Sequence, residues 1–210
     1  CQGPDGGPID PESDLWQQLR VDLLRNKWVE HRTLELAYGS PDLGIVRAEV
    51  ITGLADLVHQ VLVKRNSYAF NQTRIFRLVE RSLDQAAKVA DLFLDRFRPG
   101  SPLNDARLAE RSAALRAEVD RDVDLEDART IIGSMIDAVA AVLRTNVYLD
   151  GRFCLAMRIH PAFLATEERS ELPFGVFFVH GRGFNGFHVR FRDIARGGLR
   201  AIRTRSEEQH

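Results

Sequence analysis

The chain has 210 residues, of which 44% are hydrophobic and 28% charged, and its formal net charge is −1. These values are typical of a folded globular protein, exclude an intrinsically disordered chain, and give the chain as a whole no electrostatic bias toward nucleic acid or anionic membranes. No apolar run is long enough to cross a bilayer and no signal peptide is visible, so we predict a cytoplasmic protein.

The N-terminal two thirds of the chain carry a helical pattern. Residues 1–12 are rich in Gly, Pro and Asp and predict a flexible start, and a helical region is expected over 13–149. The clearest amphipathic stripe lies in 46–63, where apolar residues recur at three- and four-residue spacing, and the segment near 125–148 is the most apolar. The sequence predicts about five helices, over about 13–38, 46–63, 73–98, 101–119 and 125–148.

After Asp150-Gly151 the pattern changes to the two-residue period of β-strands. Residues 153–159 alternate, 174–179 form a short apolar run, and 187–191 alternate with basic residues. The predicted fold class is therefore α+β, with a helical N-terminal region followed by three strands. Cys154 lies in the first strand, where we expect a buried free thiol, because two cysteines do not make a disulfide framework.

The third strand leads into the residues with the clearest chemical potential. Its polar face carries His188, Arg190 and Arg192, and Arg196 precedes a Gly197-Gly198 turn. Paired glycines let a ligand approach the backbone, and a guanidinium can bind a carboxylate or phosphate with two hydrogen bonds. The same pattern also fits a solvated strand face followed by a simple turn.

Other chemistry is less well supported by the sequence. His188 has the titration range of a general base, with an ordinary pKa of about 6.5, but a hydrogen-bonded histidine on a strand face is the favoured interpretation. The chain contains no CxxC, HExxH or EF-hand loop, so the sequence predicts no metal site. The glycines at 181–186 have the wrong spacing for a dinucleotide-binding fingerprint.

Several blocks of sequence together resemble one enzyme family, the large-subunit class of NAD-dependent glutamate dehydrogenases. The likeness is strongest from Arg144 to Arg200. A long ungapped match makes the last block the most specific of them. The blocks are 66–75, Leu-Arg-Thr-Asn-Val-Tyr at 143–148, Ala-Met-Arg-Ile-His-Pro-Ala-Phe-Leu at 156–164, 174–184 and 186–198.

This resemblance implies oxidative deamination of L-glutamate to 2-oxoglutarate and ammonia, with NAD as the hydride acceptor. It implies that residues 150–210 begin a truncated α/β substrate-binding catalytic domain within an internal fragment of a longer homo-oligomeric enzyme. Arg196 would contact a substrate carboxylate, and Gly197 and Gly198 would line the pocket. Arg190, Asp193 and Arg200 would support that turn.

The same resemblance places the catalytic lysine and aspartate and the NAD-binding unit beyond residue 210. We therefore expect no catalytic, cofactor-binding or metal-binding residue in the chain, and no turnover by the isolated fragment. Small-subunit relatives have Lys where this chain has Arg196, and a longer loop before it.

Two other functions remain open from the sequence. The helical region fits an oligomerisation or regulatory module without catalytic activity. The basic end fits an anion- or nucleic-acid-binding module, whose binding would weaken steeply with salt. The arginines that would form it are Arg182, Arg190, Arg192, Arg196, Arg200, Arg203 and Arg205.

Overall fold

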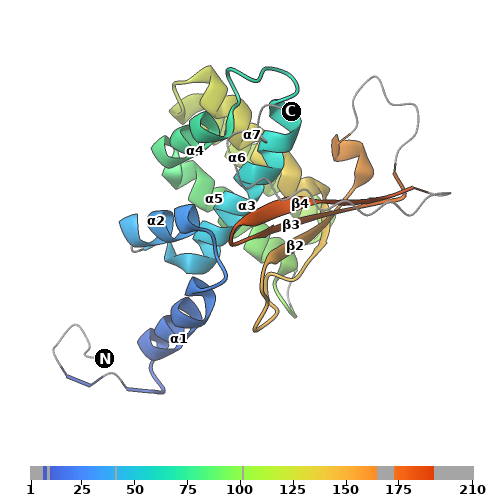
Figure 1. Ribbon diagram of the computed structural model, residues 1–210. Helices are drawn as coiled ribbons and strands as arrows, with labels where there is room; N and C mark the ends of the chain where they lie inside the picture. The colour runs from blue at the N-terminus through green and yellow to red at the C-terminus, as the bar shows by residue number, and fades with distance from the viewer. Residues whose placement is uncertain (1–6, 9, 41, 101, 165–172, 192–210) are drawn as a thin grey trace.

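The computed structural model describes residues 7–8, 10–40, 42–100, 102–164 and 173–191 (Figure 1). The predicted flexible start at 1–12 lies mostly outside these ranges. The described residues form seven helices, a short 3-10 helix and four strands, which confirms the predicted α+β class. The elements are α1 (Asp14–Asn26), α2 (His31–Gly39), α3 (Gly44–Leu62), α4 (Gln72–Arg81), α5 (Leu83–Phe97), α6 (Asp105–Asp122), α7 (Glu126–Ala141), β1 (Val142–Thr145), β2 (Leu155–Ile159), η1 (Pro161–Leu164), β3 (Gly175–Gly181) and β4 (Phe184–Arg190).

Two segments predicted as single helices are each divided in two. Between α1 and α2, Glu30 is extended (φ −67°, ψ 155°) and Val29 is 1% exposed, so the linker itself contributes to the core. Between α4 and α5, Ser82 leaves helical geometry (φ −113°, ψ 39°), and its N–H bonds the carbonyls of Leu78 and Val79. The apolar period continues across both breaks because the helices on either side pack against the same core.

The last predicted helix, 125–148, includes residues that form a strand in the structure. Helix α7 ends at Ala141, and the chain passes directly into β1, so the described residues contain four strands where the sequence predicts three. Val142 is extended (φ −71°, ψ 124°), and the Ala141 carbonyl accepts a hydrogen bond from His160 N at 2.8 Å. The β-branched Val142 continues the apolar run of α7, so periodicity alone cannot locate the change.

The sheet is an antiparallel meander in the order β1-β2-β3-β4. Strands β3 and β4 are joined by a two-residue turn at Arg182-Gly183, where Gly183 has a φ of +76°. Most of the glycine-containing segment 181–186 is therefore strand, with a turn of two residues. At the last position of β3, a Cβ on Gly181 would lie 2.8 Å from Phe184 Cζ, so a larger residue would displace that ring.

Helix α3 lies at the centre of the molecule (Figure 1). Helices α1, α2, α4, α5 and α7 contact it, and β2 and β3 pack against it as well. At the contact with the sheet, a Cβ on Gly53 would come within 3.0 Å of Leu155 Cδ2, so the glycine lets the strands approach closely. The single apolar face predicted for 46–63 is therefore too narrow, because α3 is buried nearly all around, including its polar residues Glu49, Thr52 and Asp56.

One hydrophobic core joins the helices to the inner face of the sheet. Val142, Met157 and Phe178 from three strands belong to the same cluster as Ile51 and Leu54 of α3. The domain boundary expected near residue 150 stays a prediction, and in the structure residues on both sides of it share this core.

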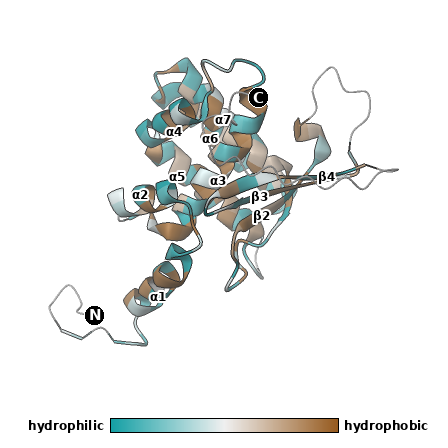
Figure 2. Cartoon of the chain, in the orientation of Figure 1, coloured by the Kyte–Doolittle hydropathy of each residue, from teal (hydrophilic) through white to brown (hydrophobic). Residues whose placement is uncertain are grey.

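Helix α1 contains several hydrophobic residues, coloured brown in Figure 2, and some of them are exposed. Leu23 and Leu24 are 64% and 59% exposed. None of the helices within the described ranges has the length and apolarity that a bilayer crossing requires.

Asn104 caps helix α6, and its replacement is expected to destabilise the fold modestly. The side-chain oxygen of this residue accepts a hydrogen bond from Arg107 N at 2.9 Å. We expect Asn104→Ala to lower the free energy of unfolding by about 1 kcal/mol. Urea denaturation measures this, with Asn104→Asp as the control that keeps a capping oxygen. Equal losses in both variants would contradict a capping role.

Candidate functional site

The sequence-predicted substrate site lies almost wholly outside the described residues. Arg196, Gly197, Gly198, Asp193 and Arg200 all fall beyond residue 191, so their assigned roles stay predictions. Of the supporting residues, Arg190 is described. It is the last residue of β4, and its side chain is exposed.

The two faces of β4 follow the predicted alternation. Phe187 and Val189 pack against the core, whereas His188 and Arg190 are exposed. The predicted apolar and basic faces of this strand are therefore confirmed over the described residues.

On the outward face of the sheet, an arginine and a histidine lie beside the ring of Phe177. Phe177 of β3 is half-buried there, with the Arg158 guanidinium carbon 6.0 Å from its ring centroid. The His188 ring lies 6.0 Å from the same ring. Arg158, Phe177 and His188 are cross-strand neighbours, so the strand register produces this arrangement. An exposed His188 is consistent with a strand-face histidine.

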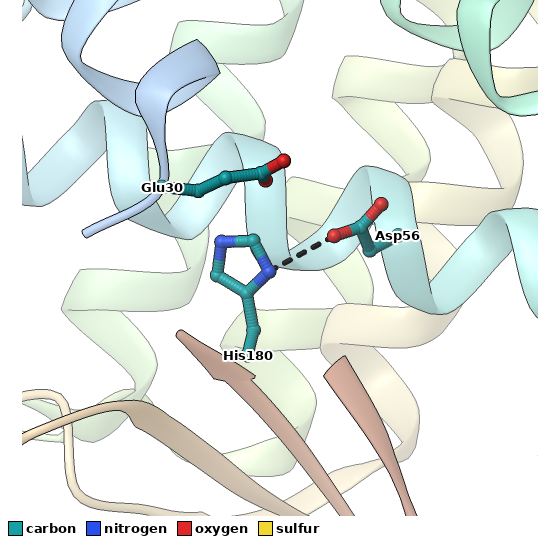
Figure 3. A group of neighbouring side chains, drawn as sticks. All are labelled: Glu30, Asp56 and His180. Atoms are coloured by element: carbon teal, nitrogen blue, oxygen red, sulfur yellow. Dashed lines mark hydrogen bonds and ion pairs between the residues drawn. The ribbon is translucent and has the colours of Figure 1, made fainter. Parts of the chain in front are cut away.

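Beneath the hairpin, the structure brings together a polar cluster that the sequence analysis did not identify. Asp56 of α3 and His180 of β3 are 0% and 1% exposed. His180 Nδ1 lies 2.9 Å from Asp56 Oδ2 (Figure 3). His180 Nε2 lies 3.2 Å from Thr52 Oγ1, one turn earlier on α3. Thr52 is 1% exposed and also bonds the Ala48 carbonyl and the Thr33 hydroxyl.

Two side-chain amides complete the surroundings of the Asp56 carboxylate. Gln72 at the start of α4 donates to Oδ1 at 3.0 Å, and Asn185 of β4 donates to Oδ2 at 2.9 Å. His180 and Asn185 are register partners across the hairpin. One carboxylate therefore binds both strands of the hairpin at the same level and ties them to α3 and α4.

The charge state of this cluster follows from its contacts. Burial opposes ionisation of both partners, but hydrogen bonds from His180, Gln72 and Asn185 hold the pKa of Asp56 below its ordinary value. Burial also disfavours the charged imidazole, yet the Asp56 carboxylate raises the pKa of His180 above its ordinary value. Both shifts favour an imidazolium–carboxylate pair in the folded chain. Glu30, reaching in from the α1–α2 linker, has its pKa raised by burial and by the Asp56 charge.

The order hydroxyl, imidazole, carboxylate matches that of a nucleophilic triad, but burial rules out that use. Thr52, His180 and Asp56 are all at most 1% exposed, so no substrate carbonyl can reach the hydroxyl. The ligand atoms of Glu30, Asp56 and His180 also lie within 4.8 Å of one another, close enough to surround a metal ion. Both oxygens of Asp56 and both ring nitrogens of His180 already have hydrogen-bond partners, which favours a structural cluster.

A second buried polar cluster joins α1, α3 and the segment before β2. The Glu49 carboxylate pairs with Arg25 and, at 2.5 Å, with Arg152. Arg25 Nη1 also donates to the Arg152 carbonyl at 2.5 Å. The side chains of Arg25, Glu49 and Arg152 are 7%, 1% and 5% exposed, so two cations share one carboxylate inside the protein. Cys154 nearby is a free thiol of intermediate exposure, and burial raises its pKa.

The C-terminal half of the chain matches known glutamate dehydrogenases. Residues 114–209 match the family model of the bacterial NAD-glutamate dehydrogenase catalytic domain. Glutamate dehydrogenase 2 of Dictyostelium discoideum is 37% identical over 102 residues, 49% of this chain and 9% of the relative. The NAD-specific glutamate dehydrogenase of Saccharomyces cerevisiae is 42% identical over 69 residues, which cover 32% of this chain and 6% of the relative. That of Neurospora crassa is 35% identical over 108 residues, which cover 51% of this chain and 10% of the relative.

The resemblance to the large NAD-dependent glutamate dehydrogenases is confirmed. The chain spans about a tenth or less of the length of these glutamate dehydrogenases. The match to the glutamate dehydrogenase catalytic domain begins within α6, upstream of the strands, so α7 belongs to the matched segment as well. No solved structure matches the chain significantly.

Proposed function

We propose that this chain is part of an NAD-dependent glutamate dehydrogenase that oxidatively deaminates L-glutamate to 2-oxoglutarate and ammonia. The observation that carries the proposal is the extent of the family match, which runs through 114–209 and so includes the sequence Arg196-Gly197-Gly198.

Within this proposal, Arg196 binds a substrate carboxylate, and Gly197 and Gly198 form the backbone wall of the glutamate pocket. A guanidinium suits this role because it stays charged and can donate two parallel hydrogen bonds to a carboxylate. Arg190, Asp193 and Arg200 support the turn. Residues 150–210 begin the substrate-binding domain under this proposal.

Cofactor binding and proton transfer are assigned to polypeptide outside this chain. NAD is bound downstream, where the family's nucleotide-binding unit and catalytic lysine lie, and the complete enzyme is a homo-oligomer. The isolated chain is then inactive. Steady NADH formation from NAD and glutamate by the purified 210-residue chain would contradict this assignment.

Replacing Arg196 in the complete enzyme tests the proposed substrate role. Arg196→Gln should raise the KM for glutamate by about 10–100-fold, because a hydrogen bond to a charged group contributes about 1.5–3 kcal/mol. The KM for NAD should change little. Initial rates of NADH formation measure both constants.

Arg182→Gln provides the matched control, since Arg182 is an exposed arginine at the hairpin turn. Equal effects of the two substitutions on the KM for glutamate would show that Arg196 does not bind the substrate. An Arg196→Gln enzyme with unchanged KM for glutamate would do the same. A complete protein without glutamate-dependent NAD reduction would instead favour the regulatory or anion-binding module.

A further inference from the structure

We propose that the pocket between the α1–α2 linker and the β3–β4 turn binds a small organic anion that has an apolar body and no ammonium group. The pocket has a volume of about 520 Å³, and its walls come from the end of α1, the linker, the start of α2 and Arg182 of the hairpin turn. This volume lies within the range of about 300–1,000 Å³ that is usual for small-molecule sites. The pocket shares no residue with either buried polar cluster.

Two positively charged side chains of this pocket have no counter-charge among the described residues. Lys27 and Arg182 are exposed, and neither forms an ion pair there. The Lys27 ammonium lies 4.8 Å from the centre of the Trp28 ring, and Arg182 Nη1 lies 3.4 Å from the Lys27 carbonyl oxygen. A carboxylate or phosphate in the pocket would therefore meet two donors that lack an anionic partner.

Apolar side chains form the rest of the wall. Leu23 of α1 is 64% exposed, Val29 of the linker is buried, and Leu34 of α2 is half-buried. Three branched aliphatic side chains stabilise a bound molecule only where that molecule has apolar surface to bury against them. The pocket is therefore suited to an organic anion and not to an inorganic ion alone.

The same lining disfavours amino acids. None of the residues that line the pocket, all of which lie within the described ranges, is Asp or Glu. At the rim, the Glu35 carboxylate already pairs with His31 at 3.3 Å. An ammonium group inside would lie near Lys27 and Arg182 without a carboxylate of its own, which costs electrostatic energy. Glutamate is excluded for this reason, so Arg182→Gln remains a valid control for the proposed glutamate site.

An anion in this pocket would add a link between two segments that are distant in sequence. The Arg182 N–H donates to the Trp28 carbonyl at 3.0 Å, so the hairpin turn already contacts the α1–α2 linker. An anion shared by Lys27 and Arg182 would join the same two segments through their side chains. Binding should therefore slow hydrogen exchange of the Arg182 amide.

Nuclear magnetic resonance titration of the isotopically labelled 210-residue chain tests the ligand class. The probe is 4-methylpentanoate, whose branched body matches the aliphatic wall, with an expected Kd on the order of 1 mM. The amide signals of Lys27 and Arg182 should shift. The neutral 4-methylpentanamide and the zwitterion leucine have the same carbon skeleton, and each should bind about fivefold more weakly or worse. Comparison with 3-methylbutyl phosphate shows whether the preferred anionic group is a carboxylate or a phosphate.

Variants at exposed positions test the assigned residues without disturbing the core. Lys27→Gln and Arg182→Gln should each raise the Kd for 4-methylpentanoate about fivefold, because each removes one charge from a largely exposed pair. Leu23→Gln should raise it about threefold through lost apolar contact. Arg144→Gln is the matched control, since Arg144 is an exposed arginine on β1 that does not line the pocket. Its Kd should equal that of the wild type.

Three results would overturn the proposal. The first is binding of 4-methylpentanamide or leucine as tight as that of 4-methylpentanoate. The second is a Kd that Lys27→Gln and Arg182→Gln leave unchanged. The third is inorganic phosphate binding as tightly as 4-methylpentanoate, which would indicate an unspecific charged surface. Each of these measurements is independent of glutamate turnover, so failure of the proposed function would leave them unaffected.

Discussion

Replacing Glu49 by Gln is expected to lower the free energy of unfolding by about 3–5 kcal/mol, because it leaves two buried guanidinium groups without a counter-charge. The side chains of Arg25 and Arg152 are 7% and 5% exposed, and both pair with this carboxylate. Burial lowers the pKa of Arg152, because the protein shields its guanidinium from water. Water cannot take over the role of the carboxylate at such a site.

The consequence should extend beyond local packing. Arg25 lies on α1, Glu49 on α3 and Arg152 just before β2, so this cluster joins three segments that are distant in sequence. Losing it should loosen α1, several of whose apolar side chains are exposed. We therefore expect Glu49→Gln to increase binding of a hydrophobic dye as well as to lower the denaturation midpoint.

Urea denaturation followed by circular dichroism measures the loss. Glu35→Gln is the control, because the Glu35 side chain is 59% exposed and pairs on the surface with His31. Surface pairs of this kind contribute about 0–1 kcal/mol. A Glu49→Gln midpoint as close to wild type as that of Glu35→Gln would show that the buried pairs do not stabilise the fold.

Local patterns predicted the parts of the fold in which each residue's environment follows from its immediate neighbours. The alternation of Phe187 and Val189 with His188 and Arg190 correctly predicted one packed and one exposed strand face. The breaks near Val29 and at Ser82 could not be found in this way. Each break leaves the apolar period intact and is produced by packing against distant segments.

The buried polar clusters could not be predicted from local patterns either, because their members lie far apart in the sequence. Asp56 and His180 are 124 positions apart, so no local spacing relates them. One signal was present in the sequence: Asp56 interrupts the apolar run Leu54-Ala55 and Leu57-Val58. A carboxylate in so apolar a helix needs a buried partner. The sequence therefore indicates that a partner exists, but the tertiary fold alone identifies it as His180.

The second large effect concerns the pH dependence that this partnership produces. The pKa of His180 is raised above 6.5, so its contribution to stability is complete below pH 6.5 and is lost as the pH rises through the folded-state value. The pKa of Asp56 is lowered below 3.8, so its contribution is present above pH 3.8 and is lost as the pH falls through the folded-state value. The pair should therefore stabilise the chain most between those two ordinary values.

Glu30 must be removed from the comparison, because it faces the same cluster and titrates in the opposite sense to Asp56. Its pKa is raised above 4.5, so ionising Glu30 costs stability as the pH rises. Glu49 is the other carboxylate whose charge acts on His180. Measurements in a Glu30→Gln background isolate the Asp56–His180 pair and leave Glu49 unchanged.

In that background, Asp56→Asn should cost about 3–5 kcal/mol near pH 6, because it leaves the imidazolium buried without its partner. The substitution should also reverse the sign of the change in unfolding free energy as the pH rises above about 6.5. Without the adjacent carboxylate, burial dominates and favours neutral His180, so the variant gains stability as the pH rises while the Asp56 protein loses it. Urea denaturation at intervals between pH 5 and about pH 9 gives both slopes. Parallel slopes in the two proteins would mean that His180 is neutral in the fold and that the hairpin is held by a neutral hydrogen bond instead of an ion pair.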